Sequence, residues 1–244
     1  MKLLAIDTTS GACSVALYDH GRVHEEFVRA ERDHTRRLLP MVDAVLAKGQ
    51  CTLAQLDTLA VSSGPGSFTG LRIAISCVQG LAFAADKPVV PVSSLAAMAA
   101  GAVRIHPQWR GAPVLAALDA RMQEVYWGLY TADQPGRALL DDAVSAPEQV
   151  VSALENAGYV SSLSAPAKGV GAGVYAAGPG WHYPQLAGLN PLDLDLELAV
   201  HAQDIAVLAA DLWQAGECVS AQDLEPAYLR NEITWKKRQR IRQG

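Results

Sequence analysis

Two aspartates in this chain have positions suited to joint chemistry, because each one ends an apolar segment and the two segments are alike. Asp7 closes the run from Leu3 to Ile6, and Asp119 closes a similar run 112 residues later, where Ala117-Leu118-Asp119 repeats Ala5-Ile6-Asp7. Two carboxylates that face each other across a cleft could hold a metal ion and a nucleotide. The alternative is structural, since an aspartate after a strand commonly accepts hydrogen bonds from the following turn. The structural interpretation is favoured, and the metal interpretation stays open.

A glycine-rich loop from Gly64 to Gly70 could bring backbone N–H groups close to a phosphate. Its spacing differs from the known phosphate loops, because five residues separate these two glycines and Leu71-Arg72 follows where a Walker loop needs Lys-Ser/Thr. Arg72 could bind an anion, but a turn in which Ser67 or Thr69 caps the next helix explains the segment better.

The histidines and serines form no recognisable catalytic motif. His20 and His24 have the interval of two metal ligands on one helical face, but Gly21 and the alternating residues around them predict a hairpin. No serine lies in a G-x-S-x-G sequence. The sequence therefore predicts no catalytic, cofactor-binding or metal-ligating residue.

The elements that position these residues begin with a mixed α/β lobe. Strands are predicted over residues 3–6, 13–18, 22–28, 59–62 and 89–92, and helices over 33–48, 71–85 and from Ser93 or Ser94 through Ala100. Three neighbouring strands followed by alternating helices and strands are typical of a mixed sheet with helices on its faces.

The pattern of strand, aspartate and hairpin then recurs, which predicts two related lobes. The second lobe is eroded, with a helix over 147–157, short strands and loops over 169–191, and a last helix over 197–214. We expect a first lobe at 1–103, a second at 104–198, a C-terminal helix and return segment at 199–231, and a basic tail at 232–244.

Two of the predicted helices are apolar on more sides than one sheet can cover. Only Pro40 and Asp43 interrupt the apolar residues from Leu38 to Ala47, and the segment 71–85 is similar. Full burial inside the lobe is one explanation, and a protein interface is the other, because exposed apolar patches usually mark partners. The candidate interface residues are Leu39, Val42, Leu46, Ala74, Ile75, Val78 and Ala82.

Composition and charge narrow the class of protein. Half of the 244 residues are apolar, which excludes a disordered chain. Net charge is -5 although the last twelve residues carry five Lys and Arg, so the body is acidic and unsuited to a broad nucleic-acid surface. The basic tail could touch RNA or stay solvated. Scattered cysteines, no signal peptide and no membrane-spanning segment indicate a cytoplasmic protein.

Several sequence strings resemble the TsaB family, formerly called YeaZ, of bacterial accessory subunits in tRNA threonylcarbamoyladenosine biosynthesis. The resemblance extends from the N-terminus to Lys237. The strings are A-I-D-T-T at 5–9, D-H-T at 33–35, S-G-P-G-S-F-T-G-L-R at 63–72, L-D-A-R-M with E-V-Y at 118–126, and E-P-A-Y-L-R-N at 225–231.

The resemblance implies two RNase H-like lobes of the actin/Hsp70-like ATPase fold. It also implies a non-catalytic subunit that pairs with TsaD, which transfers threonylcarbamoyl to the adenosine next to the anticodon of tRNA. Pairing would use the helices near 34–48 and 70–86, a homodimer would form when the chain is alone, and the ATPase TsaE would join the complex. Contact with tRNA would come only through that complex, with the basic tail as a possible contributor.

The same resemblance bears on two other functions, a glycoprotease-like metallopeptidase and an actin-fold ATP-dependent phosphotransferase. TsaD has a histidine metal pair in V-N-H-L-x-x-H, and the matching stretch here places Ser94 and Met98 at those positions. A hydroxyl and a thioether are poor substitutes for two imidazoles. The phosphotransferase alternative depends on Asp7 and Asp119 alone.

Overall fold

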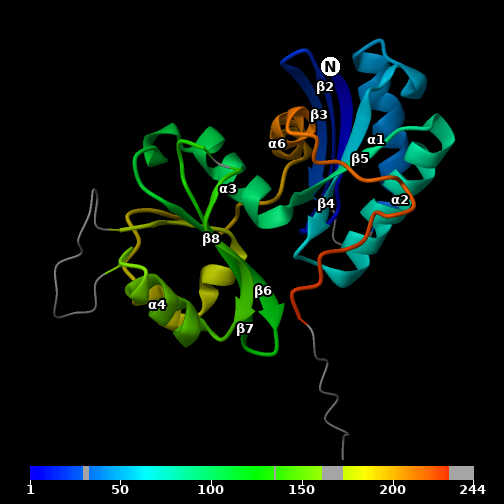
Figure 1. The fold of residues 1–244 in the computed structure, drawn as a ribbon. Helices are drawn as coiled ribbons and strands as arrows, with labels where there is room; N and C mark the ends of the chain where they lie inside the picture. Colours follow the sequence, from blue (N-terminus) through cyan, green and yellow to red (C-terminus); the bar gives the residue numbers. More distant parts are fainter. Residues whose placement is uncertain (30–32, 135, 161–172, 231–244) are drawn as a thin grey trace, which may run out of the picture.

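Each half of the chain folds around a five-stranded mixed sheet (Figure 1). The computed structural model describes residues 1–29, 33–134, 136–160 and 173–230. The first sheet contains β1 Lys2–Asp7, β2 Ala12–Asp19, β3 Arg22–Arg29, β4 Thr58–Gly64 and β5 Val89–Ser93, in the order β3-β2-β1-β4-β5. The second contains β6 Val114–Arg121, β7 Glu124–Tyr130, β8 Ala138–Ser145, β9 Tyr175–Ala177 and β10 Leu194–Asp195, in the order β10-β9-β6-β7-β8. The two orders correspond when β6 is matched to β1, which confirms the two-lobed α/β fold.

Helices cover the two sheets. They are α1 His34–Lys48, α2 Phe68–Ala85, α3 Ser94–Ile105, α4 Pro147–Asn156, α5 Pro184–Ala187 and α6 Ala202–Gln214, with 3-10 turns at Leu53–Gln55, Pro107–Trp109 and Pro179–His182. Among the described residues, α2 is long and apolar enough to cross a membrane by length and composition alone, a test that the core helices of soluble proteins also pass.

Strand β1 is central to the first sheet. It pairs antiparallel with β2, where Leu3 lies opposite Tyr18, and parallel with β4, where Leu3 lies opposite Thr58. From Leu3 to Asp7 every residue is fully buried. A strand buried in this way needs apolar cover on both faces of its sheet.

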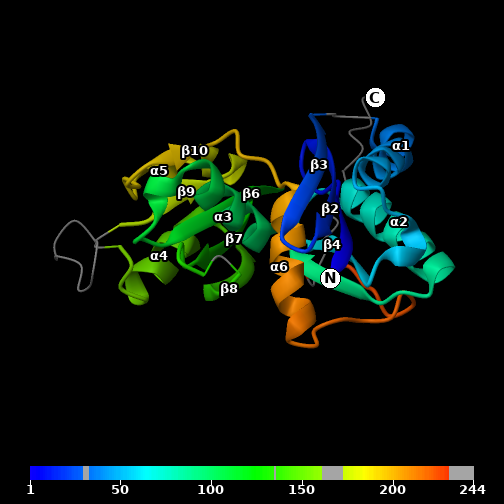
Figure 2. The ribbon, with the colours of Figure 1, turned by 90° about the horizontal axis from the view of Figure 1, so that it is seen from above.

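Three hydrophobic cores cover the faces of the two sheets. One outer core packs α1 and α2 on the first sheet, and the other packs α4 and α5 on the second. The inner core fills the space between the two sheets with α3 and α6. Figure 2 shows α6 beside the first sheet on the side of the second lobe, with α1 and α2 on the side turned away from that lobe.

The two inner helices are exchanged between the lobes. α3 follows the first lobe in sequence but packs mainly on β6 of the second, and α6 follows the second lobe but packs on β1 and β2 of the first. Arg104 of α3 donates two hydrogen bonds, of 2.7 and 2.8 Å, to the buried carboxylate of Asp204 in α6. Gly101 leaves room for this pair, because a Cβ there would lie 2.7 Å from Asp204 Oδ2. The expected boundary at residue 103 therefore cuts through a helix that belongs, by packing, to the second sheet.

Helix ends differ from the sequence prediction at three places. α2 begins at Phe68, three residues before the predicted start, because the Ser67 hydroxyl accepts from the N–H of Gly70. α3 continues past Ala100 to Ile105. α6 begins at Ala202 instead of residue 197, because His201 is extended and β10 takes up Leu194 and Asp195.

The chain after α6 returns across the first lobe as a strap, residues 218–230. Val219 exchanges two backbone hydrogen bonds of 2.8 Å with Val89 of β5, and the N–H of Ala227 donates to Ser63 O at 2.7 Å. Leu224 is buried in the outer core beside α2. The predicted basic tail, 232–244, lies outside the described residues.

The start of α6 is held by a carboxylate of the first sheet. Glu25 Oε1 accepts from Ser14 Oγ at 2.7 Å and from the N–H of Gln203 at 3.1 Å, and Oε2 lies 3.1 Å from His201 Nδ1. Ser14 Oγ in turn accepts from the N–H of Ala202 at 2.9 Å. Burial alone would raise the pKa of Glu25, but the hydrogen bonds from His201 and Ser14 outweigh it and hold the pKa below the ordinary 4.5.

We expect Glu25→Gln to lower the free energy of unfolding by about 1–3 kcal/mol at neutral pH, because charge-assisted bonds at the start of α6 are lost. A carboxylate with a lowered pKa stabilises the fold fully above its unfolded value and progressively less as pH falls. The difference between wild type and variant should therefore shrink below pH 4.5 in urea-unfolding titrations. Glu26→Gln is the control, because Glu26 pairs with Lys48 at the surface. A difference that stays constant on acidification would contradict the assignment.

Candidate functional site: a groove on the outer helices

Asp7 forms its hydrogen bonds with residues of the first lobe. Its Oδ1 accepts from Thr9 N at 3.1 Å, from Thr9 Oγ1 at 2.5 Å and from Ser62 Oγ at 2.6 Å. Its Oδ2 is buried and has no hydrogen-bond partner among the described residues. Burial raises the pKa of Asp7, and the hydrogen bonds from Ser62 and Thr9 offset this only in part. The geometry is that of an aspartate capping the next turn.

Asp119 likewise forms its hydrogen bonds and its ion pair with residues of the second lobe. Its Oδ1 accepts from Arg121 N at 2.9 Å and from the Tyr183 hydroxyl at 3.1 Å, and its Oδ2 pairs with Arg121 Nη1 at 3.1 Å. All these partners come from the second lobe, whereas those of Asp7 come from the first. Both aspartates thus match the structural interpretation of the sequence.

The glycine-rich loop packs against the turn between β1 and β2. A Cβ at Gly70 would lie 1.8 Å from Thr8 O, and one at Gly66 would lie 2.8 Å from Thr9. The Thr8 hydroxyl also donates to Gly70 O at 2.6 Å. These close approaches leave no space for a side chain at Gly66 or Gly70. Backbone packing is therefore a sufficient reason for glycine at both positions, and a bound phosphate is not needed to explain them.

The positions that correspond to the TsaD metal pair lie in the protein interior. Ser94 and Met98 are fully buried in α3. A Cβ at Gly178 would lie 2.4 Å from Met98 Sδ, so this thioether fills space between α3 and the loop after β9. Within the described residues, no group of three or more His, Cys, Asp and Glu side chains is placed to hold a metal ion.

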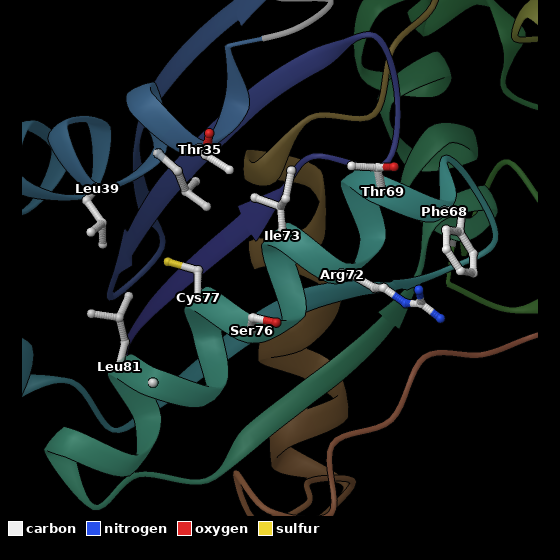
Figure 3. Close-up of a pocket in the computed structure, with 11 residues that line it drawn as sticks. Thr35, Leu39, Phe68, Thr69, Arg72, Ile73, Ser76, Cys77 and Leu81 are labelled. Atoms are coloured by element: carbon white, nitrogen blue, oxygen red, sulfur yellow. The ribbon is translucent and has the colours of Figure 1, made fainter.

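The surface of the first lobe carries a groove of about 770 Å³ between α1 and α2. Figure 3 shows Thr35 and Leu39 of α1 across from Ile73, Cys77 and Leu81 of α2. The remaining lining residues are Leu38, Phe68, Thr69, Arg72, Ser76 and Gly80. Its walls are therefore mostly apolar side chains.

Among the described residues that line the groove, Arg72 is the single charged one. Its guanidinium carbon lies 3.6 Å from the centre of the Phe68 ring, a cation–π contact (Figure 3). Burial raises the pKa of the Cys77 thiol to about 11, so this side chain is neutral at pH 7. A groove with this lining offers mainly apolar area that a bound surface would bury.

The structure places most of the predicted interface residues below the groove. Val42, Ala74, Ile75, Val78 and Ala82 are buried in the outer core against the first sheet, so their side chains are not at the surface of this lobe. Our sequence-based choice of helix faces is corrected accordingly.

Leu46 is partly buried against the same core, and Leu39 is 53% exposed and lines the groove. A charge introduced at Ala74 or Val78 would enter that core.

The sequence contained a weak signal for the exposed face of α2. Residues spaced by four lie on one side of a helix, and two such rows line the groove: Phe68, Arg72, Ser76 and Gly80, then Thr69, Ile73, Cys77 and Leu81. The polar positions Arg72 and Ser76 mark the exposed row. Two polar positions are too few to identify the exposed face of a helix that has apolar residues on both faces.

Comparison with known proteins shows close relatives over nearly the whole chain. A family model described as TsaD, tRNA N6-adenosine threonylcarbamoyltransferase, matches residues 25–211. The tRNA threonylcarbamoyladenosine biosynthesis protein TsaB of Escherichia coli is 40% identical over 97% of this chain and 98% of its own. That of Haemophilus influenzae is 38% identical over 97% of both chains. The structure of YeaZ from Pseudomonas aeruginosa is 41% identical with a TM-score of 0.80, over 93% of this chain and 99% of its own.

We expect the stability of Asp7→Asn relative to wild type to rise by about 1 kcal/mol or more between roughly pH 5 and pH 8, because the variant removes a buried charge with one unpartnered oxygen. An amide oxygen can still accept the bonds from Thr9 and Ser62. Since the pKa of Asp7 is raised, ionisation costs the folded state increasingly as pH rises, so the advantage of the variant should be smaller in acid. Thermal melts at about pH 5 and pH 8 test this. A difference between variant and wild type that is the same at both pH values would contradict a raised pKa of Asp7.

Proposed function

Because the chain belongs to the TsaB (YeaZ) family of tRNA threonylcarbamoyladenosine biosynthesis proteins, we propose that it serves there as a non-catalytic subunit that pairs with TsaD. The observation that carries the proposal is the apolar groove between α1 and α2, on the face of the first lobe turned away from the second. Within this pathway its role is to stabilise TsaD while TsaD transfers threonylcarbamoyl to the adenosine next to the anticodon of tRNA.

The choice of TsaD as partner follows from the shared fold. The TsaD family model matches residues 25–211, a range that includes α1 and α2, so a TsaD subunit is expected to have a corresponding pair of helices. Two such pairs can pack face to face as a four-helix layer, with apolar rows filling each other's grooves. The same geometry is self-complementary under a two-fold axis, which supports a homodimer when the chain is alone.

The state of the cleft supports a non-catalytic role. Asp7 and Asp119 are engaged with their own turns, and Ser94 and Met98 fill the core where TsaD carries its histidine metal ligands. These contacts count against both the metallopeptidase and the phosphotransferase alternatives. In the larger cytoplasmic assembly, TsaE and tRNA act on the surface that the pair completes.

Reconstitution tests the role directly. We expect modification of tRNA in vitro to fall when either this chain or TsaD is omitted, and this chain alone to transfer no threonylcarbamoyl group. Transfer by the isolated chain, or full activity of TsaD with TsaE in its absence, would contradict the proposal.

A single charge on the groove should prevent pairing. We expect Leu39→Glu to weaken binding to TsaD by about 2 kcal/mol or more, because it places a carboxylate in an apolar contact. Leu39 is largely exposed, so the monomer should keep its melting temperature. The matched control is Phe83→Glu, since Phe83 lies on α2, is 71% exposed and is not part of the groove lining. Calorimetric titration measures both, and equal effects of the two variants would refute the groove as the interface.

A further inference from the structure

The last residues of the strap contact both the groove and the second lobe. Tyr228 lies beside Arg72 of the groove lining, where its hydroxyl accepts from Arg72 Nη2 at 3.2 Å and its ring lies 6.4 Å from that of Phe68. Tyr228 and Phe68 are both about half exposed. Phe68, Arg72 and Tyr228 together form what we call the groove rim.

Two residues further along, the strap binds the β6–β7 hairpin. Arg230 Nη2 donates to Ala120 O at 3.2 Å and pairs closely with the Glu124 carboxylate, while Nη1 lies 3.7 Å from Met122 Sδ. The side chain of Arg230 is mostly buried by these contacts. One segment therefore connects the groove rim to the second lobe.

The anchoring of the strap on the first lobe makes this connection stiff. Besides its pairing with β5, the strap accepts a hydrogen bond from Gln79 Nε2 of α2 at Leu224 O, at 3.0 Å. Gly64 leaves room for it, because a Cβ at that glycine would lie 2.9 Å from Ala227 O. Tyr228 follows directly after these fixed points, so its position relative to α2 is set by the backbone.

We propose that the strap positions the groove rim for partner binding, with Tyr228 holding Arg72 against Phe68 and Arg230 tying this arrangement to the second lobe. This inference rests on the proposed function of the groove. A guanidinium that is already fixed loses less side-chain entropy on binding, so the partner meets a preorganised contact. The affinity for the partner then depends on the second lobe, through Arg230, although that lobe does not line the groove.

The test measures binding of the full-length chain to TsaD by calorimetry, with Tyr228→Phe, Arg230→Met and Arg72→Met alone and in pairs. Tyr228→Phe keeps the ring and removes the acceptor of Arg72, and we expect it to weaken binding about fivefold. Arg230→Met should weaken binding by a similar factor. Arg110→Met, a change at an exposed arginine after the turn Pro107–Trp109, is the control and should bind as the wild type does.

Double-mutant cycles distinguish positioning from general destabilisation. If the strap acts through Arg72, the effects of Tyr228→Phe and Arg230→Met should fall within about twofold once Arg72→Met is present. Arg230→Lys, which keeps a charge for Glu124, should recover part of the affinity. A loss of melting temperature alone would leave the effects additive with Arg72→Met, and additivity overturns the inference.

The outcomes also separate this inference from the proposed function. If Leu39→Glu weakens binding while Tyr228→Phe and Arg230→Met bind as the wild type does, the groove remains the interface and the strap has no positioning role. If wild-type protein does not bind TsaD, or Leu39→Glu has no effect, the proposed function fails first.

Discussion

The need to cover both faces of two buried sheets determines the rest of this structure. β1 is fully buried from Leu3 to Asp7, so helices must lie on both sides of it. α1 and α2 cover one face from within the first lobe, but the other face is covered by α6, which comes from the far end of the chain. Because α3 covers the second sheet in exchange, neither lobe has a complete core without the other.

The exchange fills the region between the two sheets with a closely packed core of α3 and α6. The inner core is built from alanine-rich helices, with Ala97, Ala102, Ala206 and Ala209 fully buried. Small side chains allow α3 and α6 to approach closely. Of the polar groups in this region, Arg104 and Asp204 pair across the two helices, and Asp7 accepts hydrogen bonds from the turn after β1. Asp7 and Asp119, which could serve joint chemistry by residue type, thus have hydrogen-bond partners within their own lobes.

The sequence predicted the five strands of the first sheet and the recurrence of its first strand and hairpin, because a buried strand ended by an aspartate is a local pattern. It did not predict β8 or β10 of the second sheet. It did not predict that α3 belongs by packing to the second sheet, since that depends on which surface is left uncovered by distant residues. The start of α6 was missed for a similar reason: its first N–H groups are capped by Ser14 and Glu25, which lie far away in the sequence. The face of α2 could not be assigned because apolar residues occur around the whole helix. Its packing on β4 and β1 places Val78 in the core and leaves Ile73 at the groove.

An apolar groove by itself favours binding but does not define the orientation of the bound partner, because the free energy of burying apolar area depends little on the exact angle between the two surfaces. Direction needs a polar or charged group with fixed geometry at one place in the contact. Among the described residues that line the groove, Arg72 is the only such charge, and it contacts Phe68 of its own helix and Tyr228 of the strap. The exchange of helices that leaves α1 and α2 on the outside also brings the chain end back over α2. The same constraint therefore produces both the apolar surface and the residue that can orient a partner on it.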